Sequence, residues 1–167
     1  ILDITGIIQI LNSYNLGNIK TSSADTGGII GCAYSSVIVK NSYNRGQIYS
    51  SSQRAGGIIG EGRNLTIDKC YNIGNIGIIG EAEWAGGIVG SGGTVDITNC
   101  YNTGKIQGSS HLGGIIASTS NANITNCYNV GEIIALKDYF NGGIAEGSDN
   151  TNFKYCYNSG NIQGNSY

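Results

Sequence analysis

Five cysteines are the most chemically versatile residues of this 167-residue chain, because a thiol can bind metal, form a disulfide or act as a nucleophile. A zinc site needs cysteine pairs at short spacing, such as Cys-x-x-Cys, and the chain has none. Apart from Cys32, the cysteines share one repeated position: Cys70, Cys100, Cys127 and Cys156. Stacked in register, they would lie close together with parallel side chains, a poor geometry for a disulfide. We therefore expect free packing thiols and no bound metal, with a disulfide as the open alternative.

Two aspartates are candidates for a metal site or an acid pair. Asp68 and Asp96 each precede a repeated cysteine, and we expect them at equivalent outward positions on neighbouring coils, near Lys40 and Thr98. Two carboxylates so placed could hold Ca²⁺ or act as the acid pair of a glycosidase. The single histidine, His111, lies in a variable segment, where we expect a solvated side chain rather than a catalytic base. We predict no enzyme activity, no catalytic residue and no cofactor.

Three aromatic residues are the candidates for ligand contact. Trp84, Tyr139 and Phe140 each lie shortly before a Gly-Gly pair, in segments that vary in length between repeats. Aromatic side chains on loops are used to contact sugars or proteins. The alternative is that each ring folds over the edge of its own coil.

A repeated phrase tells which elements must position these residues. The sequence Ser/Cys-Tyr-Asn recurs every 27 to 30 residues, with copies that start near residues 13, 42, 70, 100, 127 and 156. A fixed period of this size is typical of a repeat architecture.

Each repeat contains three short apolar segments rich in β-branched residues and separated by Gly, Asn and Ser. Helix-type spacing of apolar residues is missing, and the chain has 28 Gly and no Pro. One repeat cannot bury its own apolar face, whereas stacked coils can. The sequence therefore predicts an all-β fold: a parallel β-solenoid, or β-helix, with about three short strands per coil and coils of about 29 residues. We expect residues 1–167 to form one such repeat domain.

Strand alternation after a bend near Lys69 or Asn99 predicts which repeated positions face the core. The cysteines, the following Ile and the Asn of the phrase are expected inside, where stacked amides can bond to one another or to the turn backbone. This Asn column is Asn15, Asn44, Asn72, Asn102, Asn129 and Asn158. The Tyr column is expected at the corner, partly exposed: Tyr14, Tyr43, Tyr71, Tyr101, Tyr128 and Tyr157. The Gly-Gly pairs are expected to supply a positive φ.

Composition excludes several partner classes. The formal net charge is −2 and charged residues make up 12% of the chain, so no concentrated basic face is available for nucleic acid. No apolar run reaches the length of a membrane span, so we expect no membrane insertion.

The chain does not open on Met, and we expect a fragment of a larger protein whose flanking coils or domains contact it.

The combination Tyr-Asn-x-Gly-x-Ile followed by Gly-Gly-Ile-[Ile/Val]-Gly resembles the GLUG-type repeat over about residues 13 to 164. That repeat occurs in large secreted and wall-anchored bacterial proteins, including adhesin-like proteins and the non-catalytic region of some immunoglobulin A peptidases. The resemblance implies a β-solenoid at the bacterial cell surface or outside the cell, and it carries over no catalytic residue or shared ligand. Ala145-Glu146 and Ala117 depart from the pattern, which implies less regular final coils.

These features favour a non-catalytic structural and adhesive module, a stiff stalk whose lateral loops contact a host glycan or protein. Three alternatives stay open: a carbohydrate-active β-helix enzyme, an ice- or surface-binding protein, and a subunit that stacks end to end into a fibre.

Overall fold

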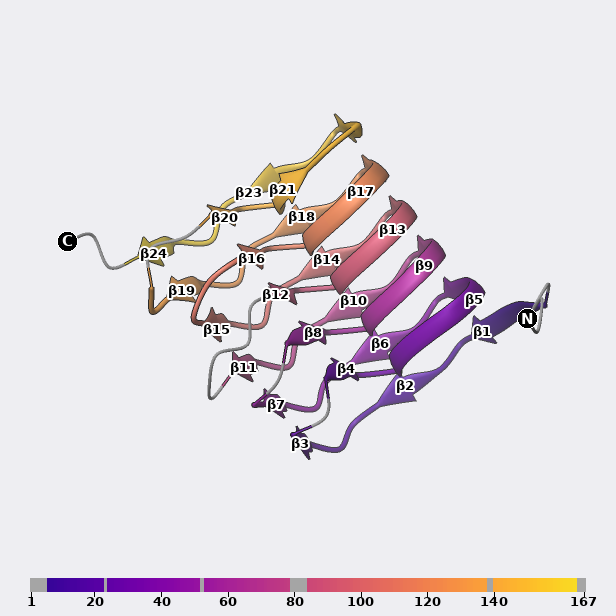
Figure 1. Cartoon of the computed structure of the whole chain (residues 1–167), viewed down its shortest axis with the longest axis horizontal. Coiled ribbons are helices and arrows are strands. Elements are labelled where there is room, and N and C mark those ends of the chain that lie inside the picture. Colours follow the sequence, from indigo (N-terminus) through magenta and orange to yellow (C-terminus); the bar gives the residue numbers. More distant parts are fainter. Residues whose placement is uncertain (1–5, 23, 52, 79–83, 138–139, 165–167) are drawn as a thin grey trace.

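The computed structural model describes residues 6–22, 24–51, 53–78, 84–137 and 140–164. All regular elements in these ranges are β-strands, and none of the described segments is a helix long and apolar enough to span a bilayer. Each strand pairs in parallel with its counterpart in the next repeat, so the chain stacks coil on coil (Figure 1). The predicted parallel β-solenoid is confirmed.

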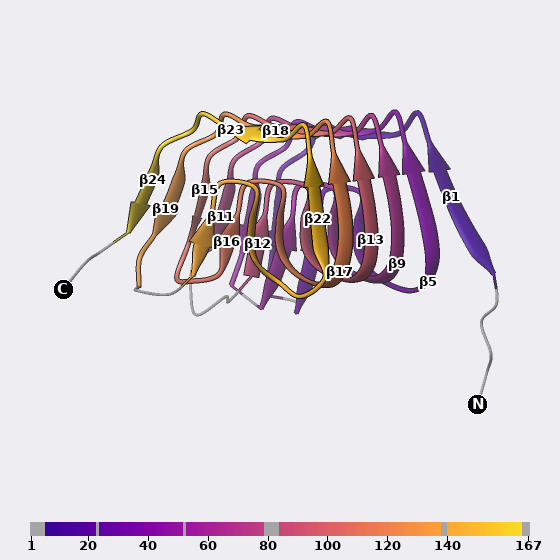
Figure 2. The same ribbon diagram turned by 90° about the horizontal axis from the view of Figure 1, so that it is seen from above.

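The longest strands form a seven-stranded sheet, which we call the long sheet. Its strands are β1 (Ile7–Leu11), β5 (Ile30–Lys40), β9 (Ile59–Asp68), β13 (Val89–Thr98), β17 (Ile116–Thr125), β21 (Ala145–Ser148) and β22 (Thr151–Lys154). They lie side by side along the long axis of the molecule (Figure 2). Alternation of apolar and polar residues lets one face line the core and the other face water.

A sharp bend follows each long strand. The residue two positions before the Tyr has a positive φ of 51 to 56° in every repeat: Asn12, Asn41, Lys69, Asn99, Asn126 and Tyr155. Asn adopts this conformation more readily than most residues, which explains why it fills four of these six positions. The next strands form a six-stranded sheet, the Tyr-Asn sheet: β2 (Tyr14–Asn15), β6 (Tyr43–Asn44), β10 (Tyr71–Asn72), β14 (Tyr101–Asn102), β18 (Tyr128–Asn129) and β23 (Tyr157–Asn158).

Two further sheets complete the coil. The Ile sheet contains β3 (Ile19–Thr21), β7 (Ile48–Ser50), β11 (Ile76–Ile78), β15 (Ile106–Gly108), β19 (Ile133–Ala135) and β24 (Ile162–Gly164). The Gly sheet contains β4 (Asp25–Gly27), β8 (Arg54–Gly56), β12 (Trp84–Gly86), β16 (Leu112–Gly113) and β20 (Asn141–Gly142). A coil therefore has four strands rather than about three, because the bend separates the Tyr-Asn strand from the long strand.

The core divides into two apolar clusters. The larger lies under the long sheet and contains Val39, Ile67, Ile97 and the buried cysteines. The smaller lies between the Ile and Gly sheets and includes Ile76, which is 1% exposed. Because equivalent residues repeat at each coil, both clusters are continuous columns rather than one central core.

The Gly-Gly pairs serve a different purpose from the one expected. None of their glycines has a positive φ; instead, neighbouring backbone lies too close for a side chain. A Cβ on Gly57 would lie 2.1 Å from the carbonyl oxygen of Gly87 and 2.5 Å from Asn72 Cβ. The prediction of a positive φ was wrong because close packing, not the turn conformation, demands glycine here.

The last coil departs from the regular pattern. Where other coils have one long strand, this coil has β21 and β22, separated at Asp149-Asn150. Asn150 has a φ of 45°, and Glu146 stands where earlier coils place Gly60 or Gly90. The expected irregularity near Ala145-Glu146 is therefore present, whereas Ala117 leaves β17 a full ten-residue strand.

Candidate functional site

The Asn column forms a continuous hydrogen-bonded ladder. Each Asn Nδ2 donates to the Oδ1 of the Asn one coil further on, at 2.7 to 2.8 Å, from Asn15 to Asn158. The same Nδ2 also donates to a glycine carbonyl two residues later, as from Asn102 to Gly104 at 2.8 Å. Asn44, Asn72, Asn102 and Asn129 are fully buried. These amides therefore have partners inside the core and stabilise the stack.

The Tyr column stacks ring on ring along one corner. Successive centroids from Tyr14 to Tyr157 lie 4.8 to 5.2 Å apart with nearly parallel planes. Tyr14 and Tyr157, at the two ends, are 60% and 55% exposed, and the tyrosines between them are half-buried. This column forms a continuous stack of partly exposed aromatic rings along the surface.

All five cysteines are free thiols. Cys100 Sγ donates to the carbonyl of Thr98 at 3.1 Å, as Ser42 Oγ donates to Lys40 at 2.9 Å. Ser42 is as fully buried as Cys100, so serine and cysteine play the same packing role in this column. Burial raises the pKa of the Cys100 thiol well above its ordinary value, which keeps it protonated and unreactive at neutral pH.

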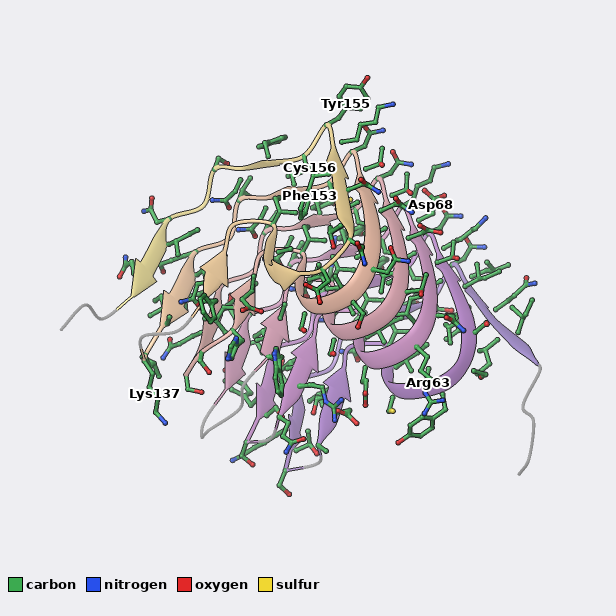
Figure 3. All side chains as sticks on the ribbon, turned by 45° about the horizontal axis from the view of Figure 1, so that its top comes forward. Arg63, Asp68, Lys137, Phe153, Tyr155 and Cys156 are labelled. Atoms are coloured by element: carbon green, nitrogen blue, oxygen red, sulfur yellow. The ribbon has the colours of Figure 1, made fainter. Side chains whose placement is uncertain are left out.

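The structure separates Asp68 from Asp96, contrary to expectation. Asp68 aligns with Lys40 and Thr98, whereas Asp96 aligns with Thr66 and Asn123. The register explains this, since Asp68 lies two residues before its cysteine and Asp96 lies four before. Asp68 points away from the long sheet into solvent (Figure 3).

Each of these carboxylates is also engaged by an amide. Asn99 donates to Asp68 and Asn123 donates to Asp96, both at 2.9 Å. The two aspartates therefore do not form the proposed acid pair on one column.

Two rows of side chains flank the Gly sheet, and the sequence analysis did not predict that they face each other. The residue at or just before the start of each Gly-sheet strand forms the lateral row: Asp25, Arg54, Trp84, His111 and Phe140. Seven residues later in each coil, the long strand supplies the facing row: Cys32, Glu61, Ser91, Ser118 and Gly147. The recurrence of these positions beside Gly-Gly was the available sequence signal.

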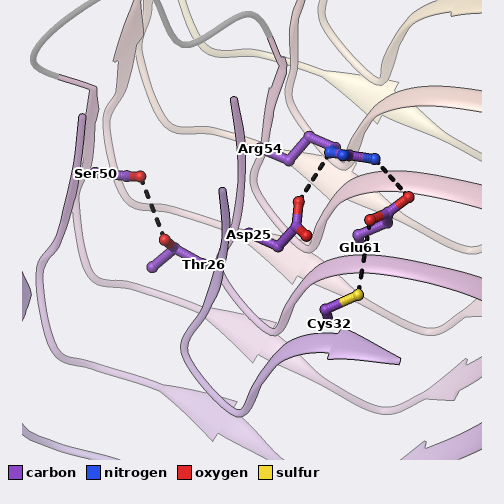
Figure 4. A network of polar contacts seen from close by, with 6 residues as sticks. All are labelled: Asp25, Thr26, Cys32, Ser50, Arg54 and Glu61. Atoms are coloured by element: carbon purple, nitrogen blue, oxygen red, sulfur yellow. Dashed lines mark hydrogen bonds and ion pairs between the residues drawn. The ribbon is translucent and has the colours of Figure 1, made fainter. Parts of the chain in front are cut away.

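In the first two coils, charged side chains bridge the lateral and facing rows (Figure 4). Arg54 Nε lies 2.8 Å from Asp25 Oδ1, without hydrogen-bond alignment, and the same guanidinium contacts Glu61. Cys32 Sγ lies 3.6 Å from Glu61 Oε2, and partial burial and the two acids raise the pKa of this thiol. Asp25, Cys32 and Glu61 lie close enough to share a cation, but Arg54 already neutralises both carboxylates.

The next three coils place aromatic rings in the lateral row. The ring centroids of Trp84 and His111 are 5.6 Å apart, and those of His111 and Phe140 are 6.1 Å apart. His111 Nδ1 lies 3.0 Å from Glu146 Oε1, and this Glu side chain is 7% exposed. The expectation of a solvated His111 was wrong, because the lateral row places its ring between two aromatic neighbours. Tyr139 lies outside the described residues.

An open crevice of about 530 Å³ lies between the rows at these coils. Its apolar side is formed by Trp84, His111 and Phe140, and its polar side by Ser118, Thr119 and Ser120 with the acidic residues Glu146 and Asp149. Another crevice of similar volume lies beside Lys20 and Tyr49, without a carboxylate in its lining. Mixed aromatic and polar linings of this size are typical of small-molecule sites. The crevice next to Trp84 is the candidate functional site.

Comparison with protein-family models, curated proteins and solved structures gives no match. The assignment to the GLUG-type repeat therefore stays a prediction made from the repeated residues.

Proposed function

We propose that this chain is a non-catalytic structural and adhesive module of a bacterial extracellular or cell-surface protein. The observation that carries the proposal is the unbroken stack of parallel ladders, in which backbone pairs and the Asn amides link every coil to the next. Such a stack makes a stiff spacer, and the crevice beside Trp84 offers a lateral contact site for a host glycan or protein.

A binding array of glycans and host matrix proteins tests the adhesive role. The wild-type chain is compared with a Trp84→Ala, Tyr139→Ala double variant of equal thermal stability. Binding by the wild type that the double variant loses supports an adhesin whose contact lies before the Gly-Gly pairs. A well-folded chain that binds nothing on the array contradicts the adhesive role and leaves the spacer.

A glycan-cleaving enzyme is the second candidate, because Glu146 and Asp149 both line the crevice. Glycosidases use two carboxylates on either side of the scissile bond. Incubation with oligosaccharides and analysis of the products separates the two functions. Shortened products that disappear in a Glu146→Gln, Asp149→Asn variant would establish an enzyme.

The outward face of the long sheet gives no comparable support to ice binding. Ice binding by such a fold requires a uniform outward row of Thr, whereas one outward row here reads Ile38, Thr66, Asp96, Asn123 and Asn152. Thermal hysteresis of the purified chain is the direct measurement, and we expect none.

The outermost coils expose apolar side chains, including Ile7 at one edge of the stack and Phe153 and Ile162 at the other. Within the described residues, β1 pairs only with β5 and β22 pairs only with β17, so the long sheet ends in a one-sided strand at each edge. We propose that further coils of the same protein, or a second copy stacked end to end, cover these edges. Sedimentation velocity at increasing concentration measures the self-association of the isolated chain, and a monomer at all concentrations would contradict end-to-end stacking.

A further inference from the structure

Charged side chains bridge the lateral row and the facing row in the first two coils. In the last three coils an open crevice lies between these two rows. In the second coil, Arg54 reaches from the lateral row to Glu61 in the facing row. In the fourth and fifth coils, the facing row carries only Ser118 and Gly147, and no Arg stands opposite them. Small facing residues beside large aromatic rings therefore create the crevice.

The charges around the crevice select its occupant. The described residues that line it include no Lys or Arg, and the Nδ1 of His111 is held by Glu146. The carboxylates of Glu146 and Asp149 repel an anionic ligand. They accept hydrogen bonds, as the hydroxyls of Ser118 and Ser120 also can, so the occupant must supply donors.

The apolar side adds a second requirement. Phe140 is 69% exposed beside the tilted ring of His111, so it presents bare aromatic surface to the occupant. A compact molecule that combines an apolar face with several hydroxyl donors meets both requirements. A pyranose ring has this combination, with C–H groups on one face and hydroxyls at its rim.

We infer that the crevice between Trp84, Phe140 and Ser118 binds an uncharged sugar residue, a neutral hexose or an N-acetylhexosamine. This inference rests on the proposed adhesive function and names the ligand class of its lateral site. The ring packs against Phe140 and the neighbouring His111, and the sugar hydroxyls donate to Asp149 and the Ser118 side of the crevice.

Saturation-transfer NMR and calorimetry with methyl glycosides of glucose, galactose, mannose and N-acetylglucosamine test the inference. Glucosamine oligomers and glucuronate oligomers serve as cationic and anionic probes. We expect binding of at least one uncharged glycoside, weaker or no binding of the anionic glucuronate probe, and a loss of about 10-fold or more in affinity for Phe140→Ala. Tyr34→Ala is the matched control, because Tyr34 is 68% exposed and lies outside the crevice, and its affinity should stay within about 2-fold.

A second variant closes the crevice without removing an aromatic wall of Trp84 or Phe140. His111→Arg combined with Ser118→Glu copies the Arg54–Glu61 pair at the equivalent positions two coils further on. We expect this double variant to keep the melting temperature of the wild type within a few degrees and to lose glycoside binding.

Three results would overturn the inference: no uncharged glycoside bound by folded wild type, unchanged affinity in both Phe140→Ala and the closed-crevice variant, or preferred binding of a charged probe. The array described above separates this failure from that of the proposed function. If both Phe140→Ala and the closed-crevice variant still bind on the array, the adhesive role stands and its contact lies outside the crevice.

Discussion

Gly87 lies directly against the side chain of Asn102. A Cβ on Gly87 would lie 2.6 Å from Asn102 Cβ and 2.1 Å from the carbonyl oxygen of Gly114. The Gly column thus provides the room in which the buried Asn ladder fits, and the two repeated motifs depend on each other although they lie 15 residues apart.

Gly87→Ala should therefore destabilise the stack by about 2–3 kcal/mol, because neighbouring coils must separate to admit the methyl group. Chemical denaturation measures the free energy of unfolding. Gly77→Ala is the control, since its Cβ would meet nothing closer than the Tyr49 ring at 3.4 Å. Equal effects of the two substitutions would show that close packing at Gly87 is not what requires glycine.

Asn102→Asp should destabilise the protein by about 3 kcal/mol or more at neutral pH. The substitution keeps the shape but replaces the Nδ2 donor, so a buried carboxylate oxygen would face Asn129 Oδ1 and the carbonyl of Gly104. Asn15→Asp, at the edge of the same ladder, should cost less than about 1 kcal/mol because water reaches it. Thermal unfolding of both variants checks the difference, and similar melting temperatures would contradict the ladder's role.

Cys100 should make stability depend on pH in the alkaline range. Burial raises the pKa of the folded thiol well above 9.0, the value expected when it is exposed. The unfolded chain loses this proton first, so Cys100 lowers the free energy of unfolding as the pH rises above the unfolded pKa. Hydrogen bonds with Cys100 lower the pKa of Cys70 and Cys127, and these two thiols oppose part of that fall. Cys100→Ser should be tolerated, because Ser42 fills the equivalent position, and should show a smaller fall. Identical pH profiles from pH 8 to 10 would contradict this assignment.

Arg54→Gln should destabilise the protein by about 1–2 kcal/mol, because it leaves Asp25 and Glu61 facing each other without a cation. The side chains of Asp25, Arg54 and Glu61 are partly exposed, so the destabilisation should be smaller at high salt. Adding Glu61→Gln to Arg54→Gln should recover part of the loss. Denaturation at low and high ionic strength measures both effects, and a loss that salt does not change would indicate lost packing rather than charge repulsion.

Much of the fold could be predicted from the spacing of repeated residues. A constant period places each residue beside its equivalent one coil away, so Cys100, Asn102 and Ile106 share an inward face by simple alternation. The bend near Lys69 and Asn99 could also be predicted from the sequence, because the apolar positions before and after it do not follow one continuous strand alternation. Counting back from the cysteine would also have separated Asp68 from Asp96, since their offsets differ.

The candidate site depended on contacts between coils that no local pattern specifies. His111 reads as an isolated loop residue until stacking places it between Trp84 and Phe140 and within 3.0 Å of Glu146. Arg54 likewise has no visible partner until Asp25 and Glu61 are brought to it.

The sequence by itself determined the coil length, the parallel architecture and the inward columns, because those follow from a repeated register in which every coil has the same neighbours. Only the tertiary structure decided where the coil surface is closed by charge and where it opens into a crevice. The segments before the Gly-Gly pairs differ in length and residue type from coil to coil, so their side chains acquire neighbours only when the coils are stacked.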